Sequence, residues 1–173
     1  MKRTAWIDRK FAFSAPPGWI YNVISRLEGT TSRLIALTTD LSDPQLSEAT
    51  SGKWSIKEHI GHLVDLESLH IHRLNQLKTG ADYLTGADMS NKATDAGDHN
   101  QKNVGELISA FGMLRQEFIA GLHDLTAEQS FHKALHPRLV IFMRPIDLAE
   151  FCAEHDDHHL TSIAEVKTKL LGR

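Results

Sequence analysis

Four stretches of the chain place apolar side chains at the i, i+3, i+4 and i+7 spacing of an amphipathic α-helix. They cover about residues 17–41, 55–77, 103–122 and 145–170. Ser55 is followed three residues later by Glu58, as in a capping box, and Asn103 suits an N-cap. Pro145 suits the first position of the fourth helix. The periodicity therefore predicts four helices, each with one face to bury.

The longest connection, residues 78–101, joins the second helix to the third and is rich in Gly, Asp and Asn. A loop of this length is unusual in a compact domain unless it is functional or crosses from one end of the fold to the other. A crossover would let the second and third helices run parallel. Residues 139–142 are expected to form a short extended piece. We predict a single all-α domain over residues 1–173, a four-helix bundle in up-down-down-up order with a long crossover between helices two and three.

Composition excludes several classes of function. The 173 residues carry a net charge of −3, which offers no basic surface to nucleic acid or to an anionic membrane. No apolar run approaches the roughly 20 residues that cross a bilayer, and the N-terminal residues lack the apolar stretch of a secretory signal. The single cysteine, Cys152, excludes an internal disulfide. We therefore expect a cytoplasmic protein that binds neither nucleic acid nor membranes.

The placement of the histidines is the main functional signal. There are 11 of them, far more than one metal site can use. In the fourth segment, 151-FCAEHDDHHLTSI-163, helical spacing puts His155 and His159 on the apolar stripe, one turn apart, and turns His158 away from it. Buried imidazoles need hydrogen-bond partners or a ligand. This pair can place both rings on one metal ion, and satisfied packing in the core is the alternative.

The second segment, 54-WSIKEHIGHLVDLE-67, offers a third ligand. His59 lies nearer the centre of the apolar face and His62 lies at its edge, and spacing alone does not choose between them. Glu67 also falls on this apolar face. It is the candidate catalytic residue, as a general base. The alternatives for Glu67 are a hydrogen bond to a metal ligand, or a carboxylate at the rim of the bundle.

These motifs resemble those of the DinB/YfiT-like superfamily. The resemblance rests on WSIKEHIGHLVDLE and on AEHDDHHL in the last helix, together with DRKFAF near the start and HPRL before the last helix. It implies a four-helix bundle with a parallel middle pair and one divalent transition metal per chain, nickel or zinc. It assigns the metal ligands to His62, His155 and His159.

Three neutral imidazoles would leave coordination positions open, as in catalytic zinc sites and unlike closed structural ones. The superfamily that the chain resembles includes thiol transferases, a mycothiol-dependent isomerase and suggested hydrolases. The H-E-x-x-H motif of zinc proteases is absent, because Asp156 stands where its glutamate would be. We therefore favour metal-dependent transfer to a small thiol, which needs no protein base. The alternatives are a metal-dependent hydrolase of a small molecule and a non-enzymatic metal-binding or sensing bundle.

The expected partners are a small-molecule substrate, a low-molecular-weight thiol and a second copy of the chain in a homodimer. Asn91 and His99 on the long loop, and Arg144 before the last helix, are candidates for a polar substrate pocket. Cys152 lies one turn before His155 and is a candidate soft ligand, with burial as a small apolar residue as the alternative.

Overall fold

A computed structural model describes residues 3–50 and 53–172. Residues 1, 2 and 173 of the predicted domain, with residues 51 and 52, lie outside the described part. The long helices are α1 Ile20–Thr38, α3 Ile56–Lys78, α5 Val104–His123 and α6 Pro145–Leu170. The short elements are α2 Asp43–Ser47, α4 Lys92–Ala96, β1 Ala134–His136 and β2 Ile141–Met143. Four single 3-10 turns complete the order, at Trp6–Asp8, Pro17–Trp19, His99–Gln101 and Gln129–Phe131.

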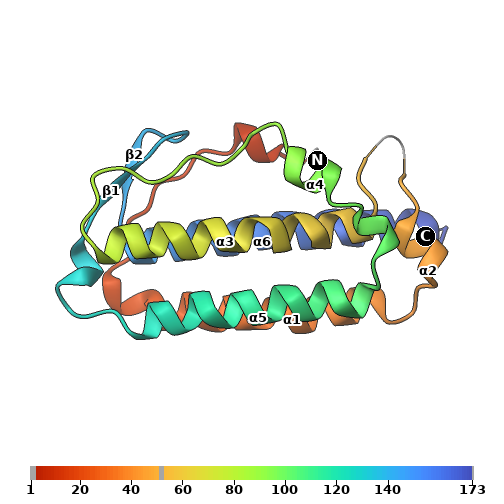
Figure 1. The fold of residues 1–173 in the computed structure, drawn as a ribbon, viewed down its shortest axis with the longest axis horizontal. Helices are drawn as coiled ribbons and strands as arrows, with labels where there is room; N and C mark the ends of the chain where they lie inside the picture. The colour runs from red at the N-terminus through yellow and green to blue at the C-terminus, as the bar shows by residue number, and fades with distance from the viewer. Residues whose placement is uncertain (1–2, 51–52, 173) are drawn as a thin grey trace.

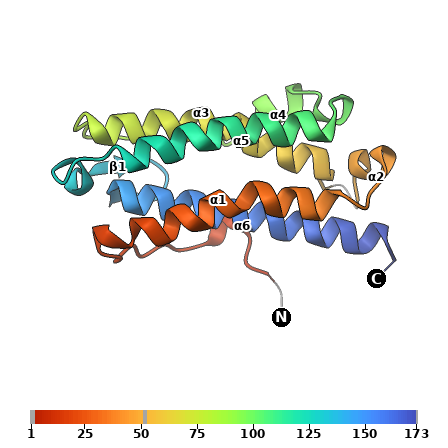
Figure 2. The same cartoon turned by 90° about the horizontal axis from the view of Figure 1, so that it is seen from below.

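The four long helices form a bundle, as predicted (Figures 1 and 2). Helix α3 packs against α5 and α6, and α1 packs against the same two helices. The colour gradient in Figure 1 shows that α3 and α5 run in one direction and that α1 and α6 run in the other. The long connection between α3 and α5 returns along the outside of the bundle, which makes these neighbours parallel. The up-down-down-up order is therefore confirmed.

The helix ends follow local chemistry. Ser55 caps α3 in a capping box with Glu58, and the side chain of Asn103 accepts from two amides at the start of α5. Helix α1 is shorter than predicted. A 3-10 turn occupies residues 17–19, and the helix ends at Thr38 and not near Leu41. Asp43 and Pro44 begin the short helix α2, for which Ser42 forms a new capping box.

Three segments form a covering layer over the seam between α3 and α6 (Figure 1). They are residues 3–16, residues 79–98 and the hairpin of residues 134–143. The hairpin pairs β1 with β2, and Tyr83 of the long connection forms a parallel bridge with Leu135. Extended structure was predicted at residues 139–142, but β2 begins at Ile141 because Val140 lies in the turn with a φ of 55°. The layer closes one side of the bundle, and its residues Leu84, Ala134 and Met143 are buried in the core.

The core is divided by a layer of charge. One apolar cluster lies toward the hairpin and includes Leu27, Phe118 and Leu148, and the other lies toward α2 and includes Leu34 and Ile163. Four polar side chains lie within the bundle, each about 1% exposed or less. They are Thr30, Glu67, Arg115 and Asp156, one from each long helix. We call these four residues the ionic layer.

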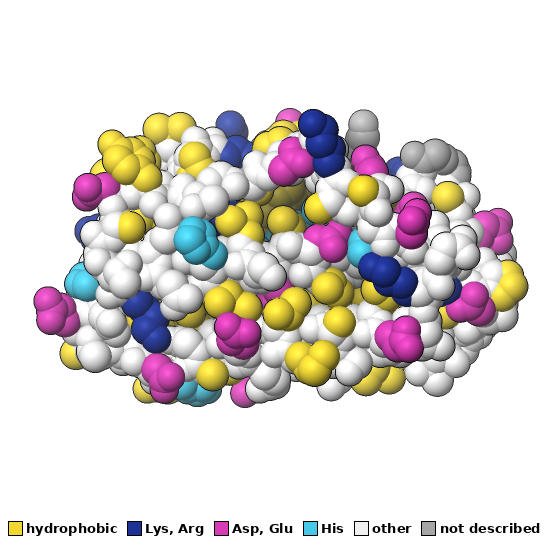
Figure 3. Space-filling view, in the orientation of Figure 1, with side chains coloured by type: hydrophobic (Ala, Val, Ile, Leu, Met, Phe, Trp, Pro, Cys, Tyr) yellow, Lys and Arg dark blue, Asp and Glu magenta, His cyan; other side chains and the backbone are white. Residues whose placement is uncertain are grey.

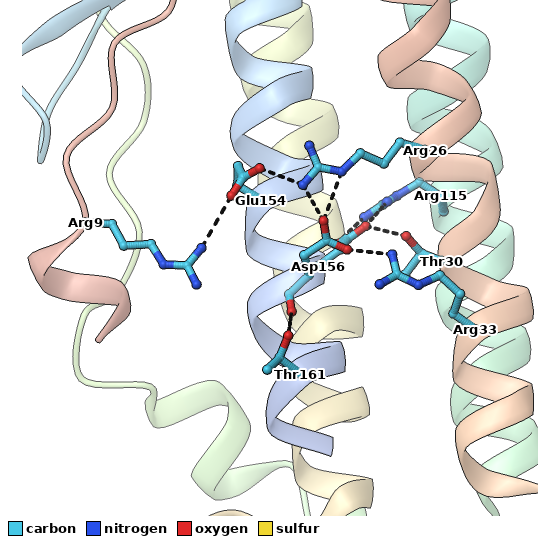
Figure 4. Close-up of polar contacts among 9 residues, drawn as sticks. Arg9, Arg26, Thr30, Arg33, Arg115, Glu154, Asp156 and Thr161 are labelled. Atoms are coloured by element: carbon cyan, nitrogen blue, oxygen red, sulfur yellow. Dashed lines mark hydrogen bonds and ion pairs between the residues drawn. The ribbon is translucent and has the colours of Figure 1, made fainter. Parts of the chain in front are cut away.

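Arg115 is the centre of the ionic layer, and Figure 4 shows it beside Thr30 and Asp156. Its guanidinium donates to Glu67 from Nε at 3.0 Å and from Nη2 at 2.6 Å. It also pairs with both carboxylate oxygens of Asp156, and Thr30 Oγ1 donates to the same carboxylate at 2.8 Å. Bidentate pairs of this kind fix the relative orientation of the two side chains and also stabilise their contact. The ionic layer therefore fixes how α1, α3, α5 and α6 face one another.

Removing Arg115 should destabilise the protein severely. Arg115→Ala leaves the carboxylate of Asp156 buried without a counter-charge and leaves Glu67 only His70, and we expect the free energy of unfolding to fall by about 3–5 kcal/mol. Urea denaturation followed by circular dichroism measures the change. The matched control is Arg33→Ala, which breaks a half-exposed pair with Asp157 and should cost at most about 1 kcal/mol. Equal losses in the two variants would contradict a central role for the ionic layer.

Candidate metal centre

Helices α3 and α6 bring His62, His155 and His159 together. One ligand atom from each ring lies within 4.8 Å of the others, and all three side chains are buried. The Nε2 atoms of His155 and His159 are 3.1 Å apart, because an i, i+4 pair projects side by side from one helix face. Two nitrogens bound to one zinc ion at 2.0–2.1 Å can be at most about 4.2 Å apart. Small ring movements would therefore bring all three nitrogens onto a single ion.

Hydrogen bonds orient two of the three rings. Thr94 of α4 donates to Asp65 at 3.0 Å, so its oxygen accepts from His62 Nδ1 at 3.0 Å and leaves His62 Nε2 as the free lone pair. His59 Nδ1 lies 3.0 Å from His159 Nδ1. His59, which lies nearer the centre of the apolar face, thus contacts the ligand candidate His159 through the ring nitrogen opposite the one that faces His155. His155 Nδ1 is buried and has no partner among the described residues.

The three rings are held in the neutral form that binds metals. Burial is the main cause that lowers the pKa of His62 to about 4. Burial, followed by neighbouring histidines such as His62, lowers the pKa of His155 and His159 well below the ordinary value. A set of neutral, buried nitrogen donors suits zinc or nickel, and the residues therefore fit the group that the sequence suggests.

The catalytic candidate Glu67 lies away from the bundle rim and away from the cavity. It is fully buried in the ionic layer, where Arg115 binds both of its oxygens and His70 Nδ1 lies 3.2 Å from Oε1. Burial alone would raise the pKa of Glu67, but Arg115 and His70 lower it to about 2. A carboxylate with these partners is a weak base. Its position supports a role in orienting the helices.

A cavity of about 710 Å³ opens beside the three histidines, between the α3–α6 seam and the covering layer. Figure 3 shows a hollow on this face of the molecule with hydrophobic side chains inside it. Its wall near the histidines is largely aromatic and aliphatic. The apolar lining includes Trp6, Trp54, Leu66, Leu69, Met89 and Phe151. The volume and the lining are those of a small-molecule site.

The predicted polar pocket residues separate in the structure. Asn91 lines the cavity. His99 is buried beside α3, where Nε2 lies 3.0 Å from Asp65. A Cβ at Gly61 would lie 2.1 Å from the ring of His99, so only glycine allows this contact. Arg144 caps α6 by pairing with Asp147 and donates to the carbonyl of residue 15, away from the cavity.

Sequence reasoning missed several residues of the cavity. His158 was expected to point away from the metal ligands, but it is half-buried, lines the cavity and contacts the rings of Trp6 and His159. Arg73, His136 and Arg138 also line the cavity. The HPRL motif that contains the last two was noted only as part of a family resemblance. Cys152 is buried and is not one of the three residues that converge.

The sequence of the chain matches a known protein family. A model of the DinB superfamily matches residues 26–163. The chain belongs to the DinB superfamily. This DinB superfamily member matches no curated protein sequence. None of its helices, within the residues that the structure describes, is long and apolar enough to cross a bilayer.

Two solved structures share the fold. YfiT from Bacillus subtilis, described as "a probable metal-dependent hydrolase with an unusual four-helix bundle topology", superposes with a TM-score of 0.81 at 19% identity. That alignment covers 95% of this chain and 94% of YfiT. The mycothiol-dependent maleylpyruvate isomerase superposes with a TM-score of 0.67 at 10% identity, over 83% of this chain and 60% of the isomerase. At these sequence identities, both similarities show that this DinB superfamily member has the same fold as the two structures.

Metal content should depend on the three converging histidines and not on their neighbour. We expect His62→Ala and His155→Ala each to lower bound nickel or zinc to a small fraction of the wild-type content, measured by mass spectrometry of the purified protein. His158→Ala is the matched control, because its ring lines the same cavity but lies outside the convergent group. Metal content that survives removal of both His62 and His155 would refute the site.

Bound metal should persist well below the ordinary imidazole pKa of about 6.5. Ligation requires neutral rings, and burial keeps His62 neutral in the folded protein down to about pH 4. The unfolded chain takes up protons on these rings first. Acidification from pH 6.5 to 4 should therefore lower the free energy of unfolding, with His62 contributing about 1.4 kcal/mol per pH unit at most.

Metal retained after gel filtration at a series of pH values, with circular dichroism at each, tests this expectation. The control is the metal-free protein in the same series, which reports the fold alone. Release with a midpoint near pH 6.5 from a protein whose helical signal is unchanged would contradict it.

Proposed function

We propose that this DinB superfamily protein binds one nickel or zinc ion through His62, His155 and His159 and uses it to catalyse a reaction of a small molecule. The observation that carries the proposal is the convergence of three neutral imidazoles on a cavity large enough for an organic substrate. When bound, such an ion acts as a Lewis acid that polarises a substrate oxygen or favours the thiolate form of a thiol.

The protein supplies a rigid platform for this chemistry. The ionic layer fixes α3 relative to α6, and these helices carry all three ligand candidates. Thr94 holds His62 in the tautomer that presents Nε2, which is the contribution expected of a residue behind a metal ligand. Preorganised ligands of this kind lower the energy needed to reach a productive geometry.

The lining of the cavity supports a substrate with an apolar body. Trp6 contacts His155, with the two ring centroids 5.0 Å apart. Trp54 contacts His62, with the two ring centroids 4.8 Å apart. Leu66, Leu69 and Phe151 extend this apolar wall. Aromatic walls bind planar or aliphatic groups and exclude water from the reacting atoms.

The preferred reaction is transfer to a low-molecular-weight thiol. Among the described residues that line the cavity, the only carboxylate is Asp88, which is exposed and binds the backbone and side chain of Ser90. Glu67 is held by Arg115. A thiolate has already lost its proton, so it needs no such base. The lack of an available carboxylate therefore favours a thiol as the nucleophile.

Hydrolysis is the second candidate, and one observation favours it. His158 lines the cavity with a buried Nδ1 that has no partner among the described residues. Burial, followed by Arg3 and Arg9, lowers its pKa to about 4, so the ring is neutral at pH 7 and can accept a proton from water. YfiT, which shares the fold, is described as a probable metal-dependent hydrolase.

A paired assay separates these reactions. The metal-loaded protein is incubated with 1-chloro-2,4-dinitrobenzene and a panel of thiols (glutathione, cysteine and mycothiol), and separately with aryl esters and amides. We expect thiol-dependent turnover that is lost in His155→Ala and changes by less than about tenfold in His158→Ala. A general base contributes about 10²–10⁴ in rate, so hydrolysis would instead fall at least about 100-fold in His158→Ala.

Thiol-independent hydrolysis with that loss would reverse the order of the two reactions. Inactivity in both panels, with one metal bound per chain, would count against an enzyme and favour a metal-binding or sensing role.

A further inference from the structure

Two arginines in the cavity have no counter-charge. Six of the eight arginines that the structure describes pair with a carboxylate: Arg3, Arg9, Arg26, Arg33, Arg115 and Arg144. The exceptions are Arg73 of α3 and Arg138 of the hairpin turn, and both line the cavity. Burying a charge without a partner is unfavourable, so this exception needs an explanation.

The donors of this cluster exceed their acceptors. Arg138 Nη2 is buried and has no partner among the described residues. Arg73 is 2% exposed, and its described hydrogen bond uses only Nε, which donates to the carbonyl of Thr85 at 2.8 Å. His136 is also 2% exposed and lines the same cavity.

The tautomer of His136 adds a third donor. The amide of Leu139 donates to His136 Nδ1 at 3.2 Å, so the proton of the neutral ring is on Nε2. That Nε2 is buried and has no partner among the described residues. The cluster therefore offers three kinds of N–H group to the cavity, and an acceptor with several lone pairs would satisfy them.

The electrostatics agree with the geometry. Burial is the main cause that lowers the pKa of Arg73 and of Arg138, and the charge of Arg138 lowers the pKa of Arg73 further. The nearby thiol of Cys152 acts on Arg73 in the opposite direction. Burial and the two arginines together lower the pKa of His136 to about 4. The cluster is thus a region of uncompensated positive potential.

The rings of Trp6 and Phe151 lie between Arg138 of the cluster and the metal centre. The guanidinium carbon of Arg138 is 5.8 Å from the ring centroids of both Trp6 and Phe151. Phe151 is four residues, or about 6 Å along the helix, before His155. A molecule that reaches from the cluster to the three histidines is therefore of the size of a short aryl or alkyl acid.

We infer that Arg73, His136 and Arg138 form a subsite for a carboxylate of the substrate. Guanidinium groups bind carboxylates with two parallel hydrogen bonds, and the Nε2–H of His136 adds a third donor. The inference rests on the proposed function, because it places the anionic end of the molecule in this subsite and its reacting end at His62, His155 and His159. It specifies the substrate class as small organic acids with an apolar body.

Calorimetric titration with 4-phenylbutyrate and with its neutral amide tests the subsite. At pH 7.5 we expect the metal-loaded wild type to bind the acid at least tenfold more tightly than the amide. This preference should disappear in Arg138→Gln, a half-buried residue of the hairpin turn, and in Arg73→Gln. The matched control is Arg9→Gln, which also removes an arginine stacked on Trp6, but one that pairs with Glu154 outside the cavity.

His155→Ala separates the subsite from the metal centre. If the carboxylate binds in the subsite, the preference for the acid survives in this variant even when metal binding and turnover are lost. A preference that vanishes in His155→Ala and persists in Arg138→Gln would place the carboxylate on the metal and overturn the inference. Equal affinities for acid and amide, or no binding of the acid by folded wild type at 10 mM, would overturn it as well.

Discussion

The pairing of Arg115 with two carboxylates determines the geometry on which the rest of the structure depends. Glu67 lies on the helix that carries His62, and Asp156 is the neighbour of His155. A single guanidinium from α5 therefore fixes the rotation of α3 and of α6 at the level of the histidines. Apolar packing alone specifies such rotations less sharply, because hydrophobic contact has little directionality. The ionic layer therefore sets the rotation of the two helices that carry the histidines.

This arrangement separates the framework from the cavity. The framework consists of four helices with two apolar clusters and a charged layer between them. The cavity lies outside that framework, and its opposite wall is the covering layer, built from an N-terminal segment, a crossover and a hairpin. The long connection thus has two roles: it makes α3 and α5 parallel, and with Thr94 it orients one of the histidines.

The sequence predicted what depends on local periodicity. The four helices and the side-by-side placement of His155 and His159 follow from spacing within one segment, and the order of the helices followed from the length of the connection at residues 78–101. The preference for His62 over His59 needed the family resemblance, because both rings face the bundle and differ only in what lies opposite them. His59 in fact lies against His159. The exact end of α1 depended on a competing cap at Ser42, which a stripe of apolar residues does not reveal.

Residues whose roles depend on distant partners could not be predicted. Glu67 was located on the correct face, but the charge that holds it comes from Arg115, a residue type that apolar periodicity does not place in a core. Arg115 is buried, whereas its apolar neighbour Leu114 is only half-buried. The phase of His158 was misjudged for a related reason, since Trp6 of the covering layer lies against it and extends the buried surface around α6. Arg73 and Arg138 come together only through the fold of the hairpin.

The contact of Trp6 with His155 has a consequence for the order of events during synthesis. Trp6 precedes all four long helices in the sequence, while its partner lies on α6, which follows the other three. During synthesis His155 and His159 therefore cannot meet His62, and Trp6 cannot close over His155, until α6 has been made. The arrangement of the three histidines thus forms only after the bulk of the bundle has been translated.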